Sequence, residues 1–491
     1  MTELRNVSEL VSRAAGRHAG KPALVDGART LTWGELEQAV ASLAGALVAR
    51  GLGSGERVGL LLPNGIEFAI AYFGVLRAGL VALPLNTAYT PTEIGYQLAD
   101  SGAALVLAAD SLAALAAESP VEVAGVPDLG ADVPGSGEPL ADARGGAEDT
   151  AVLLYTSGTS GRPKGAMLTH RALLANLAQL SRIDPPVVAP EDRVLLVLPL
   201  FHVYGLNAGL GMTAYAGATG VVAERFDPVE TLALVESAQV TNIVGAPPMY
   251  VAWSMLPRVP EALSSLRLAI SGSAPLPSSV LGTILSSTGH QVFEGYGLTE
   301  TAPVLTTALC SEVAKPGSIG RPIPGVELRL LDDQGAEVDE GDPGEIVVRG
   351  ANLFSGYWPD GNGGPDPDGW FRTGDVAIVD DDGDLFLVDR VRELILVSGF
   401  NVYPREVEDA IAGHPDVAEV AVIGIPHPYT GETVKAFVVP NAGASPTAED
   451  VIEYAARRLA RFKCPTAVEI VTELPHSAIG KVAKGRLRES A

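Results

Sequence analysis

Residues 156–165 read Thr-Ser-Gly-Thr-Ser-Gly-Arg-Pro-Lys-Gly and directly follow a short apolar run, residues 151–155. A run of this kind is typical of a buried strand. Glycines allow a loop to adopt positive φ and to bring its amides close to a ligand. Amides, hydroxyls and a lysine together suit a polyphosphate. We therefore expect a phosphate-binding loop here, with a flexible surface turn as the alternative.

The spacing of this loop differs from that of a Walker A loop, in which four residues separate a glycine from Gly-Lys-Ser/Thr. Here Gly158 and Gly161 are three apart, and Lys164 precedes another glycine. The stretch instead resembles the phosphate loop of the adenylate-forming superfamily, which contains acyl-CoA synthetases, luciferases and peptide-synthetase adenylation domains. Within it, the chain looks most like the fatty acyl-CoA ligases. The resemblance implies that ATP is bound by Thr156, Ser157, Gly158, Thr159, Ser160, Gly161 and Lys164.

Length and charge limit the class of protein. The chain has 491 residues, of which 47% are hydrophobic, and its net charge is −25, from 59 acidic and 34 basic residues. A chain of this length is expected to form roughly two to four domains or subdomains. The acidic balance makes nucleic acid and anionic membranes poor partners. An anionic ligand such as ATP then needs a locally positive site.

The cysteines and the apolar stretches point to the cytoplasm. Cys310 and Cys464 are far apart in the sequence, which does not support a disulfide framework. Residues 1–13 lack the apolar centre of a signal peptide. The longest apolar stretch, residues 69–85, is interrupted by Arg77 and by glycine and proline, so no integral membrane association is expected. The seven histidines are scattered, and we do not expect a zinc site.

Alternating helical and strand patterns predict an α/β fold with parallel sheets in the first part of the chain. Thr32 with Glu35, and Thr90 with Glu93, have the spacing of capping boxes at helix starts. From about residue 317, alternating strands separated by Gly/Asp turns predict a β-rich subdomain.

We expect residues 1–390 to form an N-terminal adenylation domain of α/β subdomains, with the β-rich subdomain at about 317–390. Residues 391–491 carry the pattern of a small α+β domain, and the resemblance implies that this domain is mobile.

The second candidate site is Glu294-Gly-Tyr-Gly-Leu-Thr-Glu300. Its glycines expose backbone around an aromatic ring, and Glu300 offers a hard oxygen ligand for Mg²⁺. An ordinary strand-to-helix turn is the alternative. The stretch resembles the superfamily's aromatic-Gly-x-Thr-Glu motif, which implies that Tyr296 packs on adenine, Thr299 contacts phosphate and Glu300 holds Mg²⁺. Residues 271–275 match the adenine-pocket loop. The resemblance thus assigns nucleotide binding to Gly272, Ser273, Ala274, Glu294, Gly295, Tyr296 and Gly297.

Residues 370–375, Trp-Phe-Arg-Thr-Gly-Asp, form the third motif. A carboxylate can accept two hydrogen bonds, and the resemblance implies that Asp375 binds both ribose hydroxyls. A capped loop is the alternative. The resemblance places Arg390 near ribose and phosphate and makes Arg392 the hinge. Beyond the hinge, it implies that Gly399 lines the pantetheine tunnel, with Ser398 and Phe400 beside it; a plain hairpin loop is the alternative.

Near the end of the chain, Lys481 matches the superfamily's catalytic lysine, although a solvated tail is the ordinary interpretation of such a segment. A carboxylate and ATP are both anions, so a lysine between them stabilises the transition state of attack at the α-phosphate. The family usually has Thr before the preceding glycine, whereas this chain has Ile479. We expect activity to survive this difference because the ammonium group is retained.

The stretch Pro-Leu-Phe-His-Val-Tyr-Gly, residues 199–205, borders the acyl site in members of the superfamily. The resemblance implies that His202 belongs to the catalytic residues. Its implied role is that of a gate between the acyl and CoA tunnels. A core histidine is the alternative. Substrate contacts are expected from His202, Tyr204, Gly205 and Gly297. The apolar neighbours include no basic residue that would pair a second carboxylate, which argues against a dicarboxylate such as malonate.

We therefore expect an ATP-dependent acyl-CoA synthetase that converts an apolar monocarboxylic acid, of medium or long chain, to acyl-CoA through acyl-AMP. ATP, Mg²⁺ and coenzyme A are the expected cofactors. Three alternatives stay open: an aryl ligase for coumarate- or benzoate-like acids, an enzyme that loads an acyl carrier protein, and a catalytically silent nucleotide-binding protein. The oligomeric state, including a homodimer, is also left open.

Overall fold

The computed structural model describes residues 4–117, 119–126, 138–156, 163–390, 393, 395–397, 400–427, 431–476 and 482–489. The chain divides into two compact units. The first comprises Met1–Glu327 and Arg349–Phe371, and the second comprises Leu328–Val348 and Arg372–Ala491. Each unit is described separately below, and the expected functional boundary at residue 390 stays a prediction.

The first unit begins with a six-stranded sheet in the order β6-β5-β3-β4-β7-β8. Its strands are parallel except β8, which runs antiparallel to β7. The strands are β3 (Arg57–Leu61), β4 (Val81–Pro84), β5 (Leu105–Ala108), β6 (Glu122–Ala124), β7 (Thr150–Thr156) and β8 (Lys164–Thr169).

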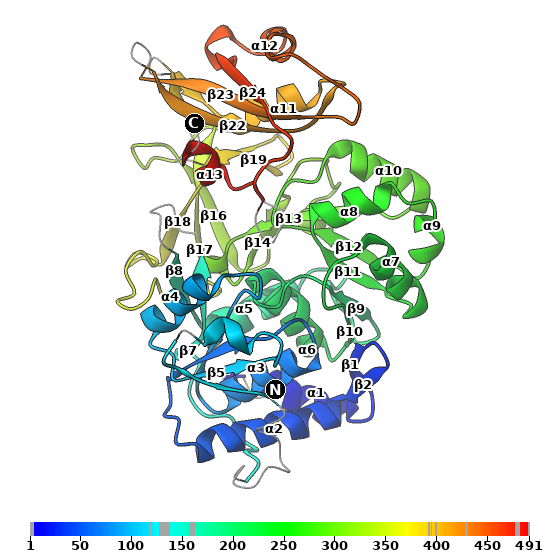
Figure 1. The fold of residues 1–491 in the computed structure, drawn as a ribbon, viewed down its shortest axis with the longest axis vertical. Helices are drawn as coiled ribbons and strands as arrows, with labels where there is room; N and C mark the ends of the chain where they lie inside the picture. The colour runs from blue at the N-terminus through cyan, green and yellow to red at the C-terminus, as the bar shows by residue number, and fades with distance from the viewer. Residues whose placement is uncertain are drawn as a thin grey trace. The chain divides into compact units, whose positions relative to one another are not determined.

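Polar caps start three of the helices associated with this sheet. The capping boxes expected at Thr32 and Thr90 are both present, and the Thr169 side chain caps a further helix. Helices α1 and α2 lie side by side (Figure 1). The helices of this part are α1 (Glu9–His18), α2 (Trp33–Ala49), α3 (Ile66–Arg77), α4 (Pro91–Ser101), η1 (Ala113–Ala116) and α5 (His170–Leu180).

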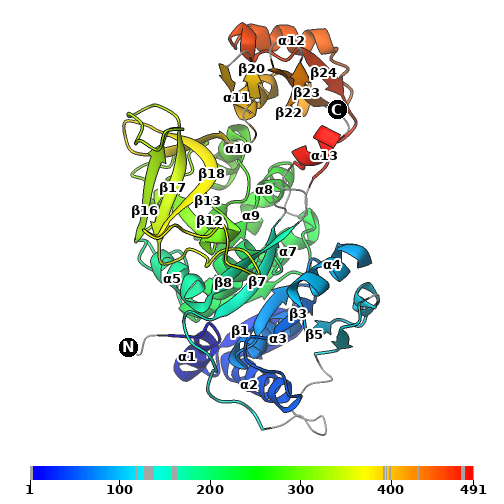
Figure 2. The same ribbon diagram turned by 90° about the vertical axis from the view of Figure 1, so that its left-hand side faces the viewer.

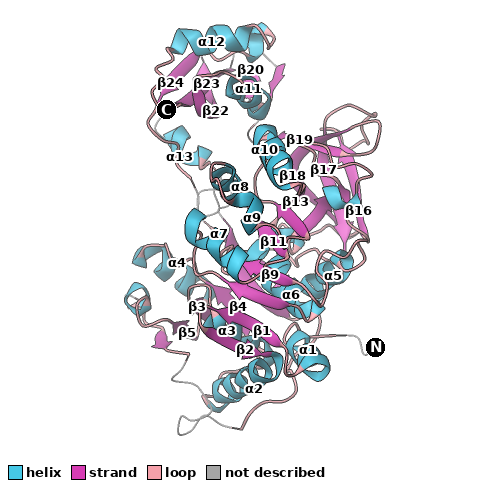
Figure 3. Cartoon of the chain, turned by 90° about the vertical axis from the view of Figure 1, so that its right-hand side faces the viewer, coloured by secondary structure: helices cyan, strands magenta, loops and turns pink. Residues whose placement is uncertain are grey.

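A nine-stranded sheet completes the first unit, in the order β15-β14-β13-β12-β11-β9-β10-β1-β2 (Figure 3). The six strands from β13 to β1 are parallel, and the outer strands β2, β14 and β15 are antiparallel. The strands are β1 (Pro22–Asp26), β2 (Arg29–Thr32), β9 (Arg193–Leu196), β10 (Thr219–Val222), β11 (Asn242–Gly245), β12 (Leu268–Ser271), β13 (Val292–Gly297), β14 (Val304–Thr307) and β15 (Arg321–Pro322).

One face of this sheet is covered by an apolar core in which Tyr250 and Trp253 are fully buried with Leu195, Val221 and Ile243. The short apolar runs of the central strands explain this core, because parallel strands are buried on both faces. The helical segments associated with the sheet are η3 (Tyr204–Gly211), α6 (Met212–Ala216), α7 (Pro228–Ser237), α8 (Pro247–Ser254), α9 (Val259–Ala262), α10 (Ser278–Thr288), η4 (Thr299–Thr301) and η5 (Ala308–Cys310).

Two smaller sheets follow. The first has the order β16-β17-β18-β19, and the second has the order β21-β20-β23-β22 with β24 paired to β23 (Figure 2). Their elements are β16 (Val326–Leu331), β17 (Gly344–Gly350), β18 (Trp370–Val379), β19 (Leu385–Arg390), β20 (Ile395–Val397), β21 (Phe400–Val402), α11 (Pro404–Ala412), β22 (Val417–His427), β23 (Gly431–Pro440), α12 (Ala448–Ala456), η6 (Arg461–Lys463), β24 (Ala467–Ile470) and α13 (Lys484–Glu489).

The expected α/β class, with a large N-terminal part and a smaller C-terminal part, is confirmed. Among the residues described above, no helix combines the length and the apolar character that crossing a bilayer requires.

Candidate active site

Three of the predicted segments leave the same edge of the nine-stranded sheet. Strands β9, β11, β12 and β13 are neighbours and parallel, so their carboxyl ends lie together. Residues 199–205 follow β9, residues 271–275 begin at the end of β12, and residues 294–300 complete and follow β13. Ligands of open α/β sheets bind at the carboxyl ends of the strands. The fold thus assembles segments that are up to a hundred residues apart in the sequence.

The predicted phosphate loop connects the antiparallel strands β7 and β8. Thr156 and Lys164, its two described ends, stand directly opposite each other in this pair. Helix α4 holds the second end, because the Tyr96 hydroxyl donates to the carbonyl oxygen of Pro163 at 3.1 Å. The predicted residues Ser157, Gly158, Thr159, Ser160 and Gly161 lie outside the described residues.

Tyr357 brings the end of this loop and Glu300 together. Its hydroxyl donates to Glu300 Oε1 at 2.6 Å, and Lys164 Nζ lies 5.6 Å from the centroid of its ring. Glu300 is only 8% exposed, and its carbonyl oxygen accepts from the Phe354 amide at 2.9 Å. One tyrosine therefore contacts both a buried carboxylate, through its hydroxyl, and an ammonium group, through its ring.

Chemically, this arrangement fits Mg²⁺ and a polyphosphate. Mg²⁺ is usually bound by one or two carboxylates and by phosphate oxygens of the substrate, with water in the remaining positions. Glu300 provides one such carboxylate, and the bond from Tyr357 occupies only its Oε1. Within the ranges that the structure describes, no group of three or more His, Cys, Asp or Glu side chains could hold a metal ion by itself. A metal bound here would thus take further ligands from phosphate oxygens and from water.

Glu294 connects two loops of the first unit. Its carboxylate is 7% exposed and accepts from the backbone amides of Leu276, at 3.0 Å, and Gly317, at 3.1 Å. Glu294 therefore ties the loop after β12 to the loop before β15. This places it among the groups that shape the predicted adenine pocket.

Gly297 is the one position of the 294–300 motif at which a side chain has no room. A Cβ there would lie 1.8 Å from the carbonyl oxygen of Pro303. Because that atom belongs to the backbone, it cannot turn away. Gly297 therefore allows the chain after Glu300 to double back against β13 and begin β14.

The expected acid-binding segment begins with a tight turn after β9 and continues as the π-helix η3. Single π-turns inside helices occur often at functional sites. Asn64 fixes the turn from outside, since its amide donates to Leu198 O at 2.9 Å and accepts from the Leu200 amide at 2.9 Å. His202 Nδ1 accepts from the Tyr204 amide at 3.3 Å, so a neutral His202 carries its proton on Nε2.

Tyr204 packs against the loop after β12. A Cβ on Gly272 would lie 2.9 Å from its ring and 3.0 Å from its hydroxyl oxygen. Burial raises the pKa of the Tyr204 phenol. In the described part of the chain, Tyr204 Oη and Ser271 Oγ are buried without a hydrogen-bond partner. Such buried hydroxyls are rare in proteins and call for an explanation.

In the second unit, the structure brings Asp375 and Arg390 to directly opposite positions on the antiparallel strands β18 and β19. Asp375 is 6% exposed. Phe400 opens β21. The predicted residues Arg392, Ser398, Gly399 and Lys481 lie outside the described residues.

Comparison with known proteins identifies the family. Residues 11–358 match the model of the AMP-binding enzyme family, and residues 406–481 match that of the AMP-binding enzyme C-terminal domain. The chain belongs to the AMP-binding enzyme family. It is therefore a member of the adenylate-forming superfamily, as the sequence motifs predicted.

Individual relatives of this AMP-binding enzyme cover almost its entire length. The feruloyl-CoA synthase of Amycolatopsis sp is 40% identical over 471 residues, with 94% of each chain covered. The long-chain-fatty-acid–CoA ligase of Salmonella typhimurium is 35% identical, with 99% of this chain and 95% of the relative covered. The crystal structure of ATP-bound MatB from Rhodopseudomonas palustris has a TM-score of 0.90 at 36% identity, with 99% of each chain covered. Together these findings make the chain an AMP-forming acyl- or aryl-CoA ligase with ATP and CoA as substrates.

Sequence reasoning missed several residues that shape the site of this AMP-binding enzyme. Tyr357 and Asn64 carry no motif, because a tyrosine after glycine and an asparagine in a Pro-Asn-Gly turn are common. Tyr357 is 57 positions from Glu300, and Asn64 is 136 positions from Leu200. Only the folded chain brings these side chains to their partners.

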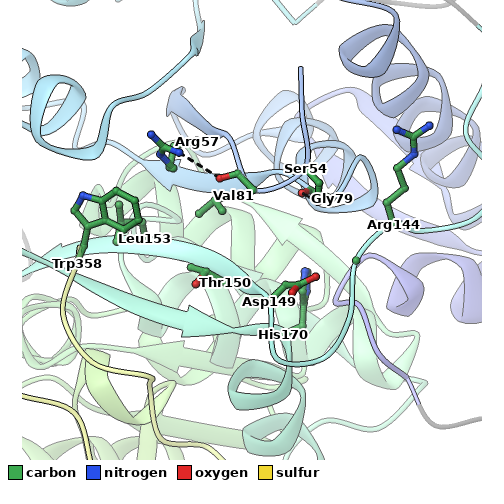
Figure 4. A pocket seen from close by; sticks show the side chains of 12 residues that line it. Ser54, Arg57, Gly79, Val81, Arg144, Asp149, Thr150, Leu153, His170 and Trp358 are labelled. Carbon is green, nitrogen blue, oxygen red and sulfur yellow. Dashed lines mark hydrogen bonds between the residues drawn. The ribbon is translucent and has the colours of Figure 1, made fainter. Parts of the chain in front are cut away.

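A separate pocket of about 280 Å³ lies in the six-stranded part of the first unit, and none of the predicted site residues lines it. Figure 4 shows Arg57 and Trp358 at one end of this pocket, with Asp149 and His170 at the other. The Arg57 guanidinium lies 5.1 Å from the centroid of the Trp358 ring. His170 is 2% exposed, and its burial lowers its pKa to about 4.

Proposed function

We propose that this chain activates an apolar monocarboxylic acid, with a medium- or long-chain fatty acid as the first candidate, and transfers the acyl group to free CoA. The observation that carries the proposal is the contact of Tyr357 with Lys164 and with Glu300, which follows the carboxyl end of β13. It supplies a metal-binding carboxylate and a phosphate-binding cation at the edge of the sheet where ligands bind in α/β folds.

In the first step, the carboxylate of the acid attacks the α-phosphorus of ATP, and pyrophosphate leaves. Lys164 and the loop before it bind the phosphates, Thr299 contacts them, and Tyr296 packs on the adenine. Glu300 would hold Mg²⁺, which would supply positive charge to offset the negative charge of the phosphates. The proposed role of the Lys481 ammonium group is to offset the repulsion between the two anions and to stabilise the charge that develops in the transition state. Asp375 binds the ribose hydroxyls, with Arg390 beside it.

In the second step, the CoA thiolate attacks the acyl-AMP carbonyl, and AMP leaves. We propose that residues 391–491 turn about Arg392 between the steps, so that Gly399, with Ser398 and Phe400, borders the pantetheine arm. His202 gates the passage between acid and CoA. A carrier-protein arm in place of free CoA is the alternative acceptor.

A second candidate substrate is an aryl acid with a polar ring substituent. Tyr204 Oη and Ser271 Oγ lack partners among the described residues, and a substrate hydroxyl could bond to either. The name of the feruloyl-CoA synthase relative agrees with this class. A site built to bond a substrate hydroxyl rejects the analogue without it by large factors, about 10⁴ or more.

The test is AMP release with a panel of straight-chain fatty acids, cinnamate and 4-hydroxycinnamate, for the wild type and for Tyr204→Phe. A fatty-acid enzyme prefers an acid of one chain length and is little changed by Tyr204→Phe. An enzyme for hydroxyaryl acids prefers 4-hydroxycinnamate over cinnamate, and Tyr204→Phe removes that preference. Preference for malonate or an amino acid would exclude both candidates.

A further inference from the structure

The backbone that follows Glu300 is held by buried asparagine side chains. Asn352 Nδ2 donates to Thr301 O at 2.8 Å, and Asn207 Nδ2 donates to Ala302 O at 2.7 Å. Asn176 bonds Val304 twice: its Nδ2 donates to the carbonyl oxygen at 2.8 Å, and its Oδ1 accepts from the amide at 3.2 Å. These bonds follow the chain from the residue after Glu300 to the first residue of β14.

The three asparagines come from separate parts of the first unit. Asn176 lies on α5, Asn207 on η3, and Asn352 just after β17, and each is fully buried at 0% exposure. Gln179, also on α5, links to this set by donating to Asn352 Oδ1 at 3.2 Å. A buried amide is costly unless it is hydrogen-bonded. Three such side-chain amides bond the backbone of the four-residue stretch 301–304, which indicates that the position of this backbone matters.

The held segment has an unfavourable backbone conformation. Ala302 has φ of +63°, in the left-handed region that residues with a side chain seldom adopt. Such conformations persist only where the surroundings impose them, and they are frequent at functional sites. The amide of Asn207 binds the carbonyl oxygen of this same residue. The left-handed conformation of Ala302 and the hydrogen bond that supports it thus lie two residues after Glu300.

Asn207 connects this segment to the acid-binding segment. It lies on η3 three residues after Tyr204, and its Nδ2 also donates to Leu173 O on α5 at 3.1 Å. One side chain, on the π-helix that carries the expected acid-binding residues, therefore bonds both α5 and the turn that carries Glu300. Its space is closed, because a Cβ on Gly211 would lie 2.6 Å from Asn207 Oδ1.

We propose that Asn207 and Asn352 are positioning residues that hold the Glu300 turn in the geometry that binds Mg²⁺ together with ATP. This inference rests on the proposed metal-binding role of Glu300. Both asparagines are fully buried, and each acts through the carbonyl oxygen that it bonds. Residues that orient metal ligands in this indirect way commonly change metal affinity or activity by roughly 10- to 100-fold when they are replaced.

The test compares Asn207→Leu with a matched control, Asn242→Leu. Asn242 lies on β11, is also 0% exposed, and also donates its Nδ2 to a backbone carbonyl, that of Val187, at 2.6 Å. In both asparagines, the Oδ1 has no hydrogen-bond partner among the described residues. Leucine has the same number of side-chain heavy atoms as asparagine and the same branching at Cγ, so each variant loses its amide bonds and introduces the same larger, apolar side chain. Isothermal titration calorimetry then measures ATP binding in the presence of Mg²⁺ and in the presence of EDTA. A separate thermal unfolding experiment gives the melting temperature of each variant.

We expect Asn207→Leu to weaken Mg²⁺-dependent ATP binding by about 10- to 100-fold, and to change binding in EDTA by less than about threefold. Asn242→Leu should lower the melting temperature comparably and leave both affinities unchanged. If Asn207→Leu does not fold, Asn352→Leu carries the same expectation. The inference is overturned if the folded variant weakens binding equally with Mg²⁺ and with EDTA, or if Asn242→Leu weakens Mg²⁺-dependent binding as much.

A turnover arm separates this inference from the proposed function. Both proteins are tested for acid-dependent pyrophosphate release and for thioester formation from supplied acyl-AMP and CoA. Asn207→Leu should slow the first reaction by about 10- to 100-fold and spare the second, which needs no Mg²⁺-ATP. If the wild type binds Mg²⁺-ATP but does not release pyrophosphate with any of the acids, the proposed function fails. The binding comparison still decides the role of Asn207 in that case.

Discussion

Replacing Tyr357 with phenylalanine tests the central contact of the site with the loss of one oxygen atom. The lost group is the hydroxyl that donates to Glu300 Oε1 at 2.6 Å. The ring remains, so the neighbouring Lys164, whose Nζ lies 5.6 Å from the ring centroid, keeps its aromatic contact. Glu300 is 8% exposed, and little water can replace the lost donor. The expected effect is therefore confined to the position and the solvation of this carboxylate.

The magnitude follows from the charge of the acceptor. A hydrogen bond to an ionised group contributes about 1.5–3 kcal/mol, and each 1.4 kcal/mol corresponds to a factor of about ten. Tyr357→Phe should thus lower kcat/KM for pyrophosphate release by roughly 10- to 150-fold. The reaction of supplied acyl-AMP with CoA should change by less than about threefold, because it does not use Glu300.

The assay is ATP–pyrophosphate exchange at saturating acid and varied Mg²⁺, followed by the thioester-forming half-reaction. Tyr72→Phe is the control, because Tyr72 is fully buried and its hydroxyl has no partner in the described part of the chain. That variant should keep full activity. Our account of the site would be refuted by unchanged exchange in Tyr357→Phe, or by equal losses in both half-reactions.

Three further predictions concern a catalytic lysine, a buried histidine and a buried ion pair. Lys481→Ala should abolish adenylation and spare thioesterification of supplied acyl-AMP. Its control, Lys484→Ala, changes a lysine that is ion-paired to Glu393 and Glu408, and should adenylate normally; equal loss of both half-reactions in Lys481→Ala would contradict the assignment. For His170, burial holds the pKa at about 4, below the unfolded value of about 6.5, so the unfolded state binds more protons between these values. Stability should therefore fall by about 1.4 kcal/mol per unit as pH decreases through this window, and His170→Asn should flatten that dependence in urea titrations; an unchanged slope would refute it. Glu37 accepts from the fully buried Arg77 at 2.6 and 2.7 Å, and Glu37→Ala should cost about 3–5 kcal/mol in urea unfolding, whereas a loss below about 1 kcal/mol would show that the charge is not trapped.

Local signals in the sequence predicted much of the fold. Thr32 and Thr90 start the expected helices, because capping depends on residues only three positions apart. The apolar run at residues 151–155, expected to form a strand, lies within β7 (Thr150–Thr156). Apolar runs of this length identify buried strands from residues next to each other.

Other features depend on contacts that no local pattern records. The π-helix at Tyr204–Gly211 follows a turn held by Asn64, a residue more than a hundred positions earlier. Asn207 meets Ala302 across 95 positions. An asparagine in an apolar segment is equally compatible with an exposed surface or a buried bond, and the choice is made by packing. For this reason the motifs predict which residues bind and react, but they carry no signal for the residues that hold the backbone in place.

The central claim is that this chain links an acid to CoA in a reaction that converts ATP to AMP and pyrophosphate. The most direct measurement is AMP release with ATP and Mg²⁺ over a ladder of fatty and aryl acids, with and without CoA. We predict turnover that requires both CoA and acid, favours one acid, and yields one acyl-CoA per AMP. Pyrophosphate release that stalls even with CoA present would contradict free CoA as the acceptor, and no AMP with any acid would contradict the account itself.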